Sequence, residues 1–306
     1  KYWYPLDERR TAIMHIPNHL TFFIFHHAAI FPETLWPRRV SLNEALLSEG
    51  KKMSKSLGNV IPLVEAIREH GADVIRLFLT SANDASSTLD WREKDVESLK
   101  GKLERFYEII NSAKSGDKSQ VGRWLVAKFH QNLKDATEFI EDYQFKQYSQ
   151  KMFFEMLNDV ESCINRTGNS PKEIVAGWTK ALSPIIPHVC EELWNKLGNK
   201  NFASREPWPV FDKRKIDKNI LELENIFKKT QEDLNQVLKL AGKKKNAYLY
   251  FVTDKELDYF EESLKYLKNL FAFKKVELYK VSDKNKYDPE GKSSRAKYGK
   301  PAIYLE

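Results

Sequence analysis

The residues best suited to chemistry lie between Gly50 and Val60, a segment that reads GKKMSKSLGNV. Lys52 and Lys55 place two ammonium groups three residues apart, with serine hydroxyls beside them and glycines on both sides. Glycine lets a backbone bend and approach a ligand closely, and lysine is a compact point charge suited to phosphate oxygens. The segment therefore predicts a flexible loop that closes on a phosphate chain and stabilises the negative charge that develops as pyrophosphate leaves.

A loop of lysine and serine is usually only a solvated turn, and a lone KxxK pattern would be interpreted in that way. Here the complete KMSKS is followed by Gly58 and Asn59, which makes the pattern more specific. We expect the helix that starts after Asn59 to add its N-terminal dipole to the site.

The elements that must position this loop are short and punctuated by Pro and Gly, as is typical of an α/β unit in the first 90 residues. The pattern predicts a strand at Arg38–Leu42 and helices at Ile61–His70 and Val74–Ser81. Gly71 is placed as the C-cap of the first helix, and Asp73 is expected to cap the second.

From Trp91 to about Leu240 the pattern is helical, with apolar residues recurring at three and four positions. Serial helices with short connections predict an antiparallel bundle. The expected helices are Gln120–Asp142, Phe145–Asn165, one after Pro171, one from Pro187 and Ile216–Leu240. Six aromatic residues are expected in its core rather than on a base-stacking surface: Phe139, Tyr143, Phe145, Tyr148, Phe153 and Phe154.

The tail is expected to be a small α/β module. Strands are predicted at Ala247–Val252, Lys275–Val281 and Pro301–Leu305, with a helix at Asp254–Asn269 and a polar loop at Lys284–Lys300. The fold class is therefore multidomain and mostly α, with α/β units at both ends.

The chain of 306 residues carries a net charge of +7. Most of the excess lies in the tail, where about 15 basic and about 10 acidic side chains follow Ala241. This balance is compatible with a polyanionic partner. The candidate RNA-backbone contacts are Lys243, Lys244, Lys245, Lys274, Lys275, Lys292, Arg295 and Lys297.

The cysteine content and the hydropathy of the chain indicate its cellular location. The only two cysteines, Cys163 and Cys190, stand in unrelated contexts and predict no disulfide framework or zinc site, so a reducing, cytoplasmic location is expected. The longest apolar run, Leu20 to Phe31, is interrupted by two histidines, and no membrane partner is expected. The pairs His15/His19 and His26/His27 lack any HExxH or CxxC context and are not expected to hold a metal.

The loop and its surroundings resemble a known family. KMSKS closely resembles the second signature of the class I aminoacyl-tRNA synthetases. The segments NHLTFF (from Asn18), GADVIRLF (from Gly71), LDWR (from Leu89) and PHVCEELW (from Pro187) look like segments of leucyl-tRNA synthetases of the archaeal and eukaryal type. The resemblance covers nearly the whole chain in colinear order.

The resemblance implies roles for particular residues. Lys52 and Lys55 would contact the phosphates of ATP, which normally arrives with Mg2+. Met53 would seat the loop, and Ser54 and Ser56 would add hydroxyl or backbone contacts. His19 could border the leucine and adenylate site, or could simply pack at a helix end.

The resemblance also implies a domain organisation. Residues 1–90 would form the second half of a Rossmann-type catalytic domain, 91–241 a helical anticodon-binding-type bundle, and 242–306 a small C-terminal domain that binds tRNA(Leu). The sequence departs from the family where TAIMH (from Thr11) replaces the usual SGKDL and where Asn43-Glu44 replaces Asn-Gly. We therefore expect an altered adenylate contact at the first segment and an altered turn at the second.

No HIGH-type motif and no editing domain are found in the sequence, so we expect this chain alone to be inactive. The first hypothesis is one subunit of a split leucyl-tRNA synthetase, completed by a second chain with the HIGH half and the editing domain. An artificial truncation fits the same observations, since the chain begins with Lys1. The alternatives are a non-catalytic tRNA-binding module with a vestigial loop, and a fragment of a valyl or isoleucyl enzyme.

Overall fold

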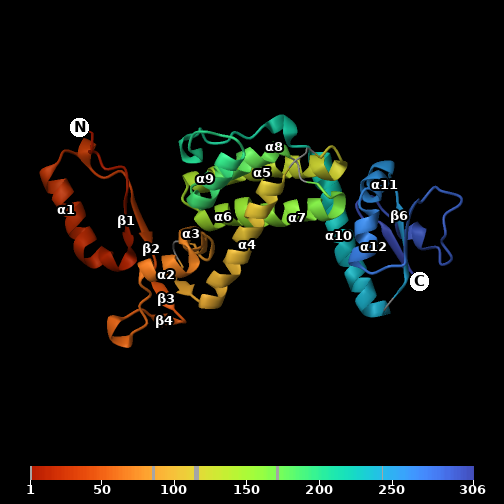
Figure 1. The fold of residues 1–306 in the computed structure, drawn as a ribbon, viewed down its shortest axis with the longest axis horizontal. Coiled ribbons are helices and arrows are strands. Elements are labelled where there is room, and N and C mark those ends of the chain that lie inside the picture. The colour runs from red at the N-terminus through yellow and green to blue at the C-terminus, as the bar shows by residue number, and fades with distance from the viewer. Residues whose placement is uncertain (1, 85–86, 114–116, 170–171, 243) are drawn as a thin grey trace.

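The structure is a computed structural model that describes residues 2–84, 87–113, 117–169, 172–242 and 244–306. The chain is drawn out in one direction, with a small unit at each end and a group of helices between them (Figure 1). No helix among these residues is both long enough and apolar enough to cross a bilayer.

The first unit is a βαβ arrangement. Strands β1 (Arg9–Ala12) and β2 (Val40–Asn43) pair in parallel, and helix α1 (Thr21–Ile30) lies in the connection between them. Parallel neighbours need such a crossover because a tight turn cannot join them. The predicted strand at Arg38–Leu42 is thus present, shifted by one or two residues. Three short turns complete the unit: Ile13–His15, the π turn Ile16–Leu20 and Glu33–Leu35.

A second small sheet carries the lysine loop. Its order is β4-β3-β5, with β3 (Leu46–Ser48) antiparallel to β4 (Lys51–Lys52) and parallel to β5 (Leu89–Trp91). Among the described residues the strands of the first 91 positions are therefore divided between two small sheets rather than gathered in one.

Helices α2 (Leu63–His70) and α3 (Ala72–Ser81) join β4 to β5, close to the predicted positions. Gly71 separates them with a φ of 86°, a conformation that glycine adopts without a steric penalty.

The prediction that Asp73 caps its own helix was wrong. Gly71 is the N-cap of α3, and the buried Asp73 carboxylate accepts hydrogen bonds from the amides of His188 (3.3 Å) and Val189 (2.7 Å). These amides are unpaired donors at the start of helix α9 (Pro187–Lys196), which an acidic side chain satisfies well. Arg76 of α3 completes the joint by donating to the carbonyl of Ile185. Asp73 therefore ties the loop-bearing unit to the helical region.

The middle of the chain is a group of packed helices, as predicted (Figure 1). In chain order they are α4 (Glu93–Ser112), α5 (Gln120–Glu141), α6 (Phe145–Ser149), α7 (Met156–Thr167), α8 (Lys172–Leu182), α9 (Pro187–Lys196) and α10 (Lys218–Ala241). A π segment, Gln150–Glu155, joins α6 to α7, and short turns lie at Ala203–Arg205 and Lys213–Lys215. Pro171 lies outside the described residues.

The core of this region is aromatic. Trp124, Trp178 and Phe106 are fully buried, and the rings of Phe106 and Trp178 meet edge to face at 4.8 Å. Five of the six aromatic side chains expected there lie in or against the core: Phe139, Phe145, Tyr148, Phe153 and Phe154. Tyr143 differs, because its φ of 59° turns it toward the βαβ unit, where the Arg39 guanidinium lies 4.9 Å from its ring.

The tail forms a three-stranded sheet with two helices. The order is β7-β6-β8, from β6 (Asn246–Phe251), β7 (Lys275–Lys280) and β8 (Ala302–Leu305). The single predicted helix at Asp254–Asn269 is two helices, α11 (Asp254–Glu261) and α12 (Leu264–Leu270). The break frees Glu262 and Ser263 for contacts with the middle region. A short turn at Lys292–Arg295 lies in the loop before β8.

Candidate functional site

The lysine loop is anchored by a tight hairpin. Glu49 and Gly50 connect β3 to β4 with φ values of 50° and 75°, the backbone that a two-residue hairpin turn needs. The Gly50 amide donates to the Asp90 carboxylate at 2.8 Å, and Arg92 donates to the other oxygen of Asp90 at 2.8 Å. The Gly50 amide, and then Arg92, hold the pKa of Asp90 below its usual range. Asp90 therefore remains an anion that fixes the hairpin.

The loop itself presents both lysines to solvent. After β4 the chain passes through Met53 and Ser54, which are half-buried, and forms a single 3-10 turn at Lys55–Leu57. Lys52 and Lys55 are exposed, and neither ammonium forms an ion pair with any residue that the structure describes. Their positive charges are available to an anionic ligand.

Serine hydroxyls pair with each other in this loop. The hydroxyl oxygens of Ser54 and Ser56 lie 2.7 Å apart, so one donates to the other. The turn ends at Gly58, whose left-handed φ of 66° reverses the chain. The two serines thus help shape the loop as well as offering hydroxyls on it.

Asn59 was missed as a functional candidate by the sequence analysis. Its side-chain oxygen accepts from the Ser54 amide at 2.8 Å, and its side-chain nitrogen donates to the Lys52 carbonyl at 3.1 Å. The only sequence signal was that an Asn follows the motif glycine, where such a side chain can bond to nearby backbone.

The helix expected after Asn59, whose N-terminal dipole was predicted to add to the site, starts two residues later than predicted. Helix α2 begins only at Leu63, after Pro62, because Ile61-Pro62 continues as extended chain. The residue before a proline is biased away from helical geometry. The loop is therefore followed by its own 3-10 turn and an extended segment.

His19 lies in the other sheet unit. It is part of the π turn Ile16–Leu20, where Arg9 of β1 donates to its Nε2 at 3.1 Å. Its ring centroid lies 4.9 Å from that of His15. No hydrogen bond joins His19 to the lysine loop within the described part of the chain.

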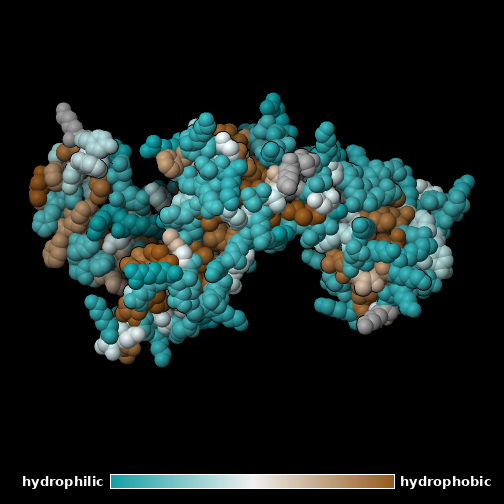
Figure 2. All heavy atoms as spheres, viewed as in Figure 1, coloured by the Kyte–Doolittle hydropathy of each residue, from teal (hydrophilic) through white to brown (hydrophobic). Residues whose placement is uncertain are grey.

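Helix α1 leaves much apolar surface uncovered. Phe22, Phe25 and Ile30 are 63%, 68% and 67% exposed, and apolar side chains occur on all sides of the helix. Figure 2 shows apolar surface over this first unit at the left of the view. A helix that is apolar all round is normally buried by other structure.

Two groups of basic side chains lie at opposite ends of the C-terminal sheet. Lys245 immediately precedes β6, and the Lys274 amide donates to its carbonyl at 2.7 Å, which brings Lys244, Lys245, Lys274 and Lys275 together. Lys243 lies outside the described residues. Lys275 pairs with Glu277 at 2.8 Å, whereas Lys244 is half-exposed and Lys245 and Lys274 are exposed.

The second group is near the start of β8. Lys292 and Arg295 lie on the short 3-10 turn and Lys297 follows it, while β8 begins opposite Tyr250 and ends opposite Ala247. Lys292 is engaged by Glu290 at 3.1 Å, and Arg295 and Lys297 are exposed. Lys244 and Lys245 therefore share one patch with Lys274 and Lys275. The group of Lys292, Arg295 and Lys297 lies apart from this patch.

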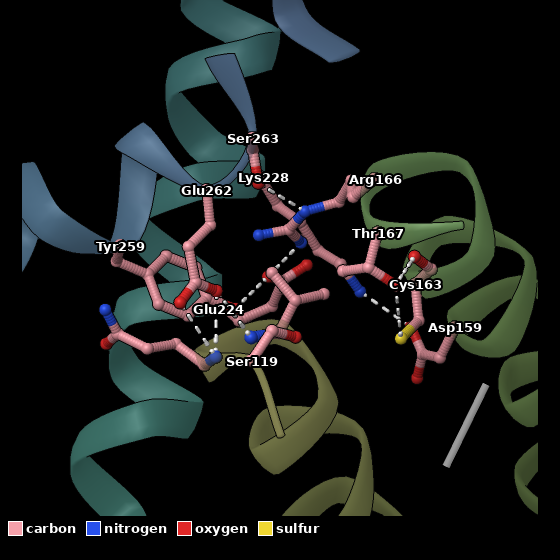
Figure 3. A network of polar contacts seen from close by, with 12 residues as sticks. Ser119, Asp159, Cys163, Arg166, Thr167, Glu224, Lys228, Tyr259, Glu262 and Ser263 are labelled. Carbon is pink, nitrogen blue, oxygen red and sulfur yellow. Dashed lines mark hydrogen bonds and ion pairs between the residues drawn. The ribbon is translucent and has the colours of Figure 1, made fainter. Parts of the chain in front are cut away.

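A buried charged network joins the helices to the C-terminal module (Figure 3). Arg166 of α7 donates to Glu224 of α10 at 2.6 Å and to the Ser263 hydroxyl at 2.7 Å. Tyr259 of α11 also donates to Glu224 at 2.6 Å. Burial alone would lower the pKa of Arg166, but the Glu224 charge keeps it raised. Glu262 then caps helix α5 by accepting from the Gln120 amide at 2.8 Å.

One group among the described residues has His and carboxylate atoms close enough for a metal: Glu69, His70 and Glu93. Glu93 already pairs with His70 at 2.8 Å and accepts from the Trp91 indole at 3.2 Å. These contacts explain the proximity of His70 and Glu93 by hydrogen bonding to each other and to Trp91 of β5.

Two protein-family models match separate segments of the chain. Residues 41–92, which hold the lysine loop, match the model of the class I tRNA synthetases of the I, L, M and V group. Residues 122–251 match the anticodon-binding domain of tRNA ligases. In both segments the chain is therefore similar to class I tRNA synthetases.

Several curated proteins that are similar to the chain are leucine--tRNA ligases, and the matches extend over about four-fifths of its length. It is 40% identical over 260 residues to the leucine--tRNA ligase of Staphylothermus marinus, covering 81% of this chain and 27% of that protein. With leucine--tRNA ligase 2 of Metallosphaera sedula the identity is 39%, covering 84% and 28%. The chain thus spans little more than a quarter of the length of these relatives.

A solved structure supports the fold. The chain resembles the LeuRS of Agrobacterium radiobacter K84, determined as a ternary LeuRS-tRNA-LeuAMS complex, with a TM-score of 0.59 and 22% identity. The match covers 70% of this chain and 30% of that one. The mostly helical, multidomain architecture is therefore similar to part of that LeuRS.

Proposed function

We propose that this chain is the part of a leucine--tRNA ligase that acts through the KMSKS loop in the ATP-dependent activation of leucine and its transfer to tRNA(Leu). The observation that carries the proposal is the exposed pair Lys52 and Lys55 on a hydrogen-bonded loop, within the segment that matches the class I synthetases. Two ammonium groups can neutralise the charge that develops on the departing pyrophosphate.

The neighbouring loop residues have smaller roles in this proposal. Met53, half-buried, seats the loop, and Ser54 and Ser56 offer hydroxyl or backbone contacts to the ATP phosphates. His19 lies in a different unit, so a role at the leucine pocket depends on the surface that covers the βαβ unit.

We assign residues 1–90 to the C-terminal part of the catalytic domain, 91–241 to the anticodon-binding-type bundle and 242–306 to a C-terminal tRNA-binding domain. The family match over residues 122–251 supports the middle assignment. The patch of Lys244, Lys245, Lys274 and Lys275 and the group of Lys292, Arg295 and Lys297 would contact RNA phosphates, where counterion release favours binding.

A complementary part of the enzyme is required by this proposal. It would carry the HIGH half and the editing domain, either on a second protein chain or elsewhere in a longer protein. The uncovered α1 surface supports this, as does the quarter of the relatives' length that the chain spans. A cytoplasmic location follows from the same proposal.

Magnesium would arrive with ATP. Asp90 and Glu49 accept hydrogen bonds from the amides of Gly50 and Glu93, and the group of three possible metal ligands found among the described residues, Glu69, His70 and Glu93, includes no residue of the loop. The described residues around the loop therefore do not form a magnesium ligand set, and the ion would be held by the phosphates and the complementary part.

The test is leucine-dependent ATP–pyrophosphate exchange by this chain alone and after mixing with polypeptides that carry a HIGH motif. We expect exchange only in a mixture, with leucine preferred over valine and isoleucine. Preference for valine or isoleucine would reassign the amino acid. Absence of exchange in every mixture, with tRNA binding intact, would indicate a non-catalytic tRNA-binding module.

A further inference from the structure

The lysine loop needs a restraint that its sequence alone does not supply. Glycines bracket the loop, and the hairpin hydrogen bonds of β4 end at Lys52, so the chain from Met53 to Gly58 has no strand partner. Two lysines on an unrestrained loop would sample many separations. Catalysis by fixed charges depends on holding them where charge develops.

Asn59 supplies a restraint that spans the loop. Its carboxamide accepts from the Ser54 amide at 2.8 Å and donates to the Lys52 carbonyl at 3.1 Å. These two bonds involve the residue at the start of the loop and the residue immediately before the turn of Lys55. The Asn59 side chain, at the end of the loop, therefore forms hydrogen bonds with both segments that carry the lysines.

The two hydrogen bonds require a side chain that has both an acceptor and a donor, as a carboxamide does. An amide donor on Ser54 needs an acceptor, and the Lys52 carbonyl needs a donor, so only a side chain with both can make the pair. Asn59 is half-buried and directly follows Gly58, whose φ of 66° directs the chain back toward β4. Aspartate could accept from Ser54 but could not donate to Lys52, and alanine could do neither.

We propose that Asn59 is a positioning residue of the KMSKS loop: it holds the segments that carry Lys52 and Lys55 in the arrangement used when pyrophosphate leaves. This inference rests on the proposed function. It assigns to Asn59 an effect on the turnover number, because the two lysines remain present and can still attract ATP when the restraint is lost.

The first measurement does not depend on activity. Hydrogen exchange of the Ser54 amide is followed by NMR in this chain for the wild type, Asn59→Ala and Asn59→Asp. We expect protection to fall in Asn59→Ala and to be largely kept in Asn59→Asp, because a carboxylate still accepts that bond. Unchanged Ser54 protection in Asn59→Ala would overturn the proposal. Asn219→Ala, an exposed asparagine on α10, is the matched control.

The second measurement is leucine-dependent pyrophosphate exchange in the mixture with the HIGH-bearing polypeptide. We expect the kcat of Asn59→Ala to fall roughly 10- to 100-fold, the loss that a misplacement of about 1 Å produces, while the KM for ATP changes little. We expect Asn59→Asp to be slower than wild type as well, since it lacks the bond to Lys52. A raised KM with unchanged kcat, or an unchanged kcat, would overturn the positioning role.

The two inferences fail in different ways. If the wild-type mixture shows no exchange, the proposed function fails and the catalytic role of Asn59 falls with it, while Ser54 protection still decides whether the restraint exists. If Lys55→Ala abolishes exchange but Asn59→Ala does not alter it, the function stands and the role of Asn59 is rejected.

Discussion

The guanidinium of Arg166 lies 2.6 Å from the carboxylate of Glu224, and the two side chains are 0% and 2% exposed. The pair joins α7 to α10, and through Ser263 and Tyr259 it reaches the C-terminal module (Figure 3). The Arg166 guanidinium also lies 4.0 Å from the Phe227 ring centroid. The joint between the helices and the module is therefore buried and charged.

Replacing one member of this pair should be costly. Arg166→Met leaves Glu224 buried without its cation, and we expect the free energy of unfolding to fall by roughly 3–5 kcal/mol. The double variant Arg166→Met/Glu224→Leu should recover most of that loss, because it removes both charges. Chemical denaturation of the three proteins measures this.

The matched control for that prediction is Arg105→Met. Arg105 pairs with Glu161 at 2.8 Å on the surface, and we expect it to contribute less than about 1 kcal/mol. Equal losses for Arg105→Met and Arg166→Met would contradict the view that burial makes the Arg166 pair important.

The lysine loop should act on leucine activation and not on RNA binding. Lys55→Ala is expected to lower pyrophosphate exchange in the complemented enzyme on the order of 10²- to 10³-fold, the usual effect of losing one charge-stabilising group. Lys51→Ala changes an exposed lysine one residue before Lys52 and should alter exchange far less. A similar loss in both variants would mean that only the general positive charge matters.

The patch at one end of the C-terminal sheet should contact RNA phosphates. Lys245→Ala with Lys274→Ala is expected to weaken tRNA binding and to reduce the slope of log affinity against log salt by about one for each lysine. Titrations at several salt concentrations measure that slope. Lys284→Ala, an exposed lysine of the same module outside both groups, should leave the slope unchanged. An unaltered slope in the double variant would remove this patch from the RNA interface.

The two buried cysteines should be unreactive in the folded protein. Burial raises the pKa of Cys163 to about 12 and also raises the pKa of Cys190. At pH 8 both thiols therefore stay protonated, and a thiol reagent such as Ellman's reagent should label them only after denaturation. Rapid labelling of the native chain would show that the region around α7 and α9 opens readily.

The same shift predicts the sign of a pH effect on stability. In the unfolded chain a thiol loses its proton above roughly pH 8.5, whereas the folded Cys163 keeps its proton up to about pH 12. The stabilising contribution is therefore complete below about pH 8.5 and decreases as pH rises toward 12. Cys163→Ala should reduce this part of the alkaline destabilisation.

Much of the fold could be predicted from local sequence. The helix that becomes α5 was placed to within one residue, because its apolar periodicity is regular and Ser119 caps its start by accepting from the Gly122 amide. Gly71 was placed at the end of α2 because glycine tolerates its positive φ. The motif also located the lysine loop, since its charges and glycines are consecutive.

What the sequence could not reveal depends on contacts between distant residues. Asp73 and Val189 are 116 positions apart, so nothing local indicated that Asp73 caps α9 instead of its own helix. Ser263 lies at the break in the predicted helix and accepts a hydrogen bond from Arg166, 97 positions away, which no local pattern indicated. The role of Asn59 was missed for another reason: an asparagine after a glycine is common in turns, and only the three-dimensional bonds distinguish it.

The exposed apolar surface of α1 has a consequence for how much of the protein accumulates in a cell. Phe22, Phe25 and Ile30 offer what chaperones and quality-control proteases bind on unfinished assemblies. Until that surface is covered, by the same polypeptide or by another, newly made molecules should be retained by chaperones or degraded. If a separate polypeptide covers α1, the abundance of this protein would follow the supply of that polypeptide rather than its own rate of synthesis.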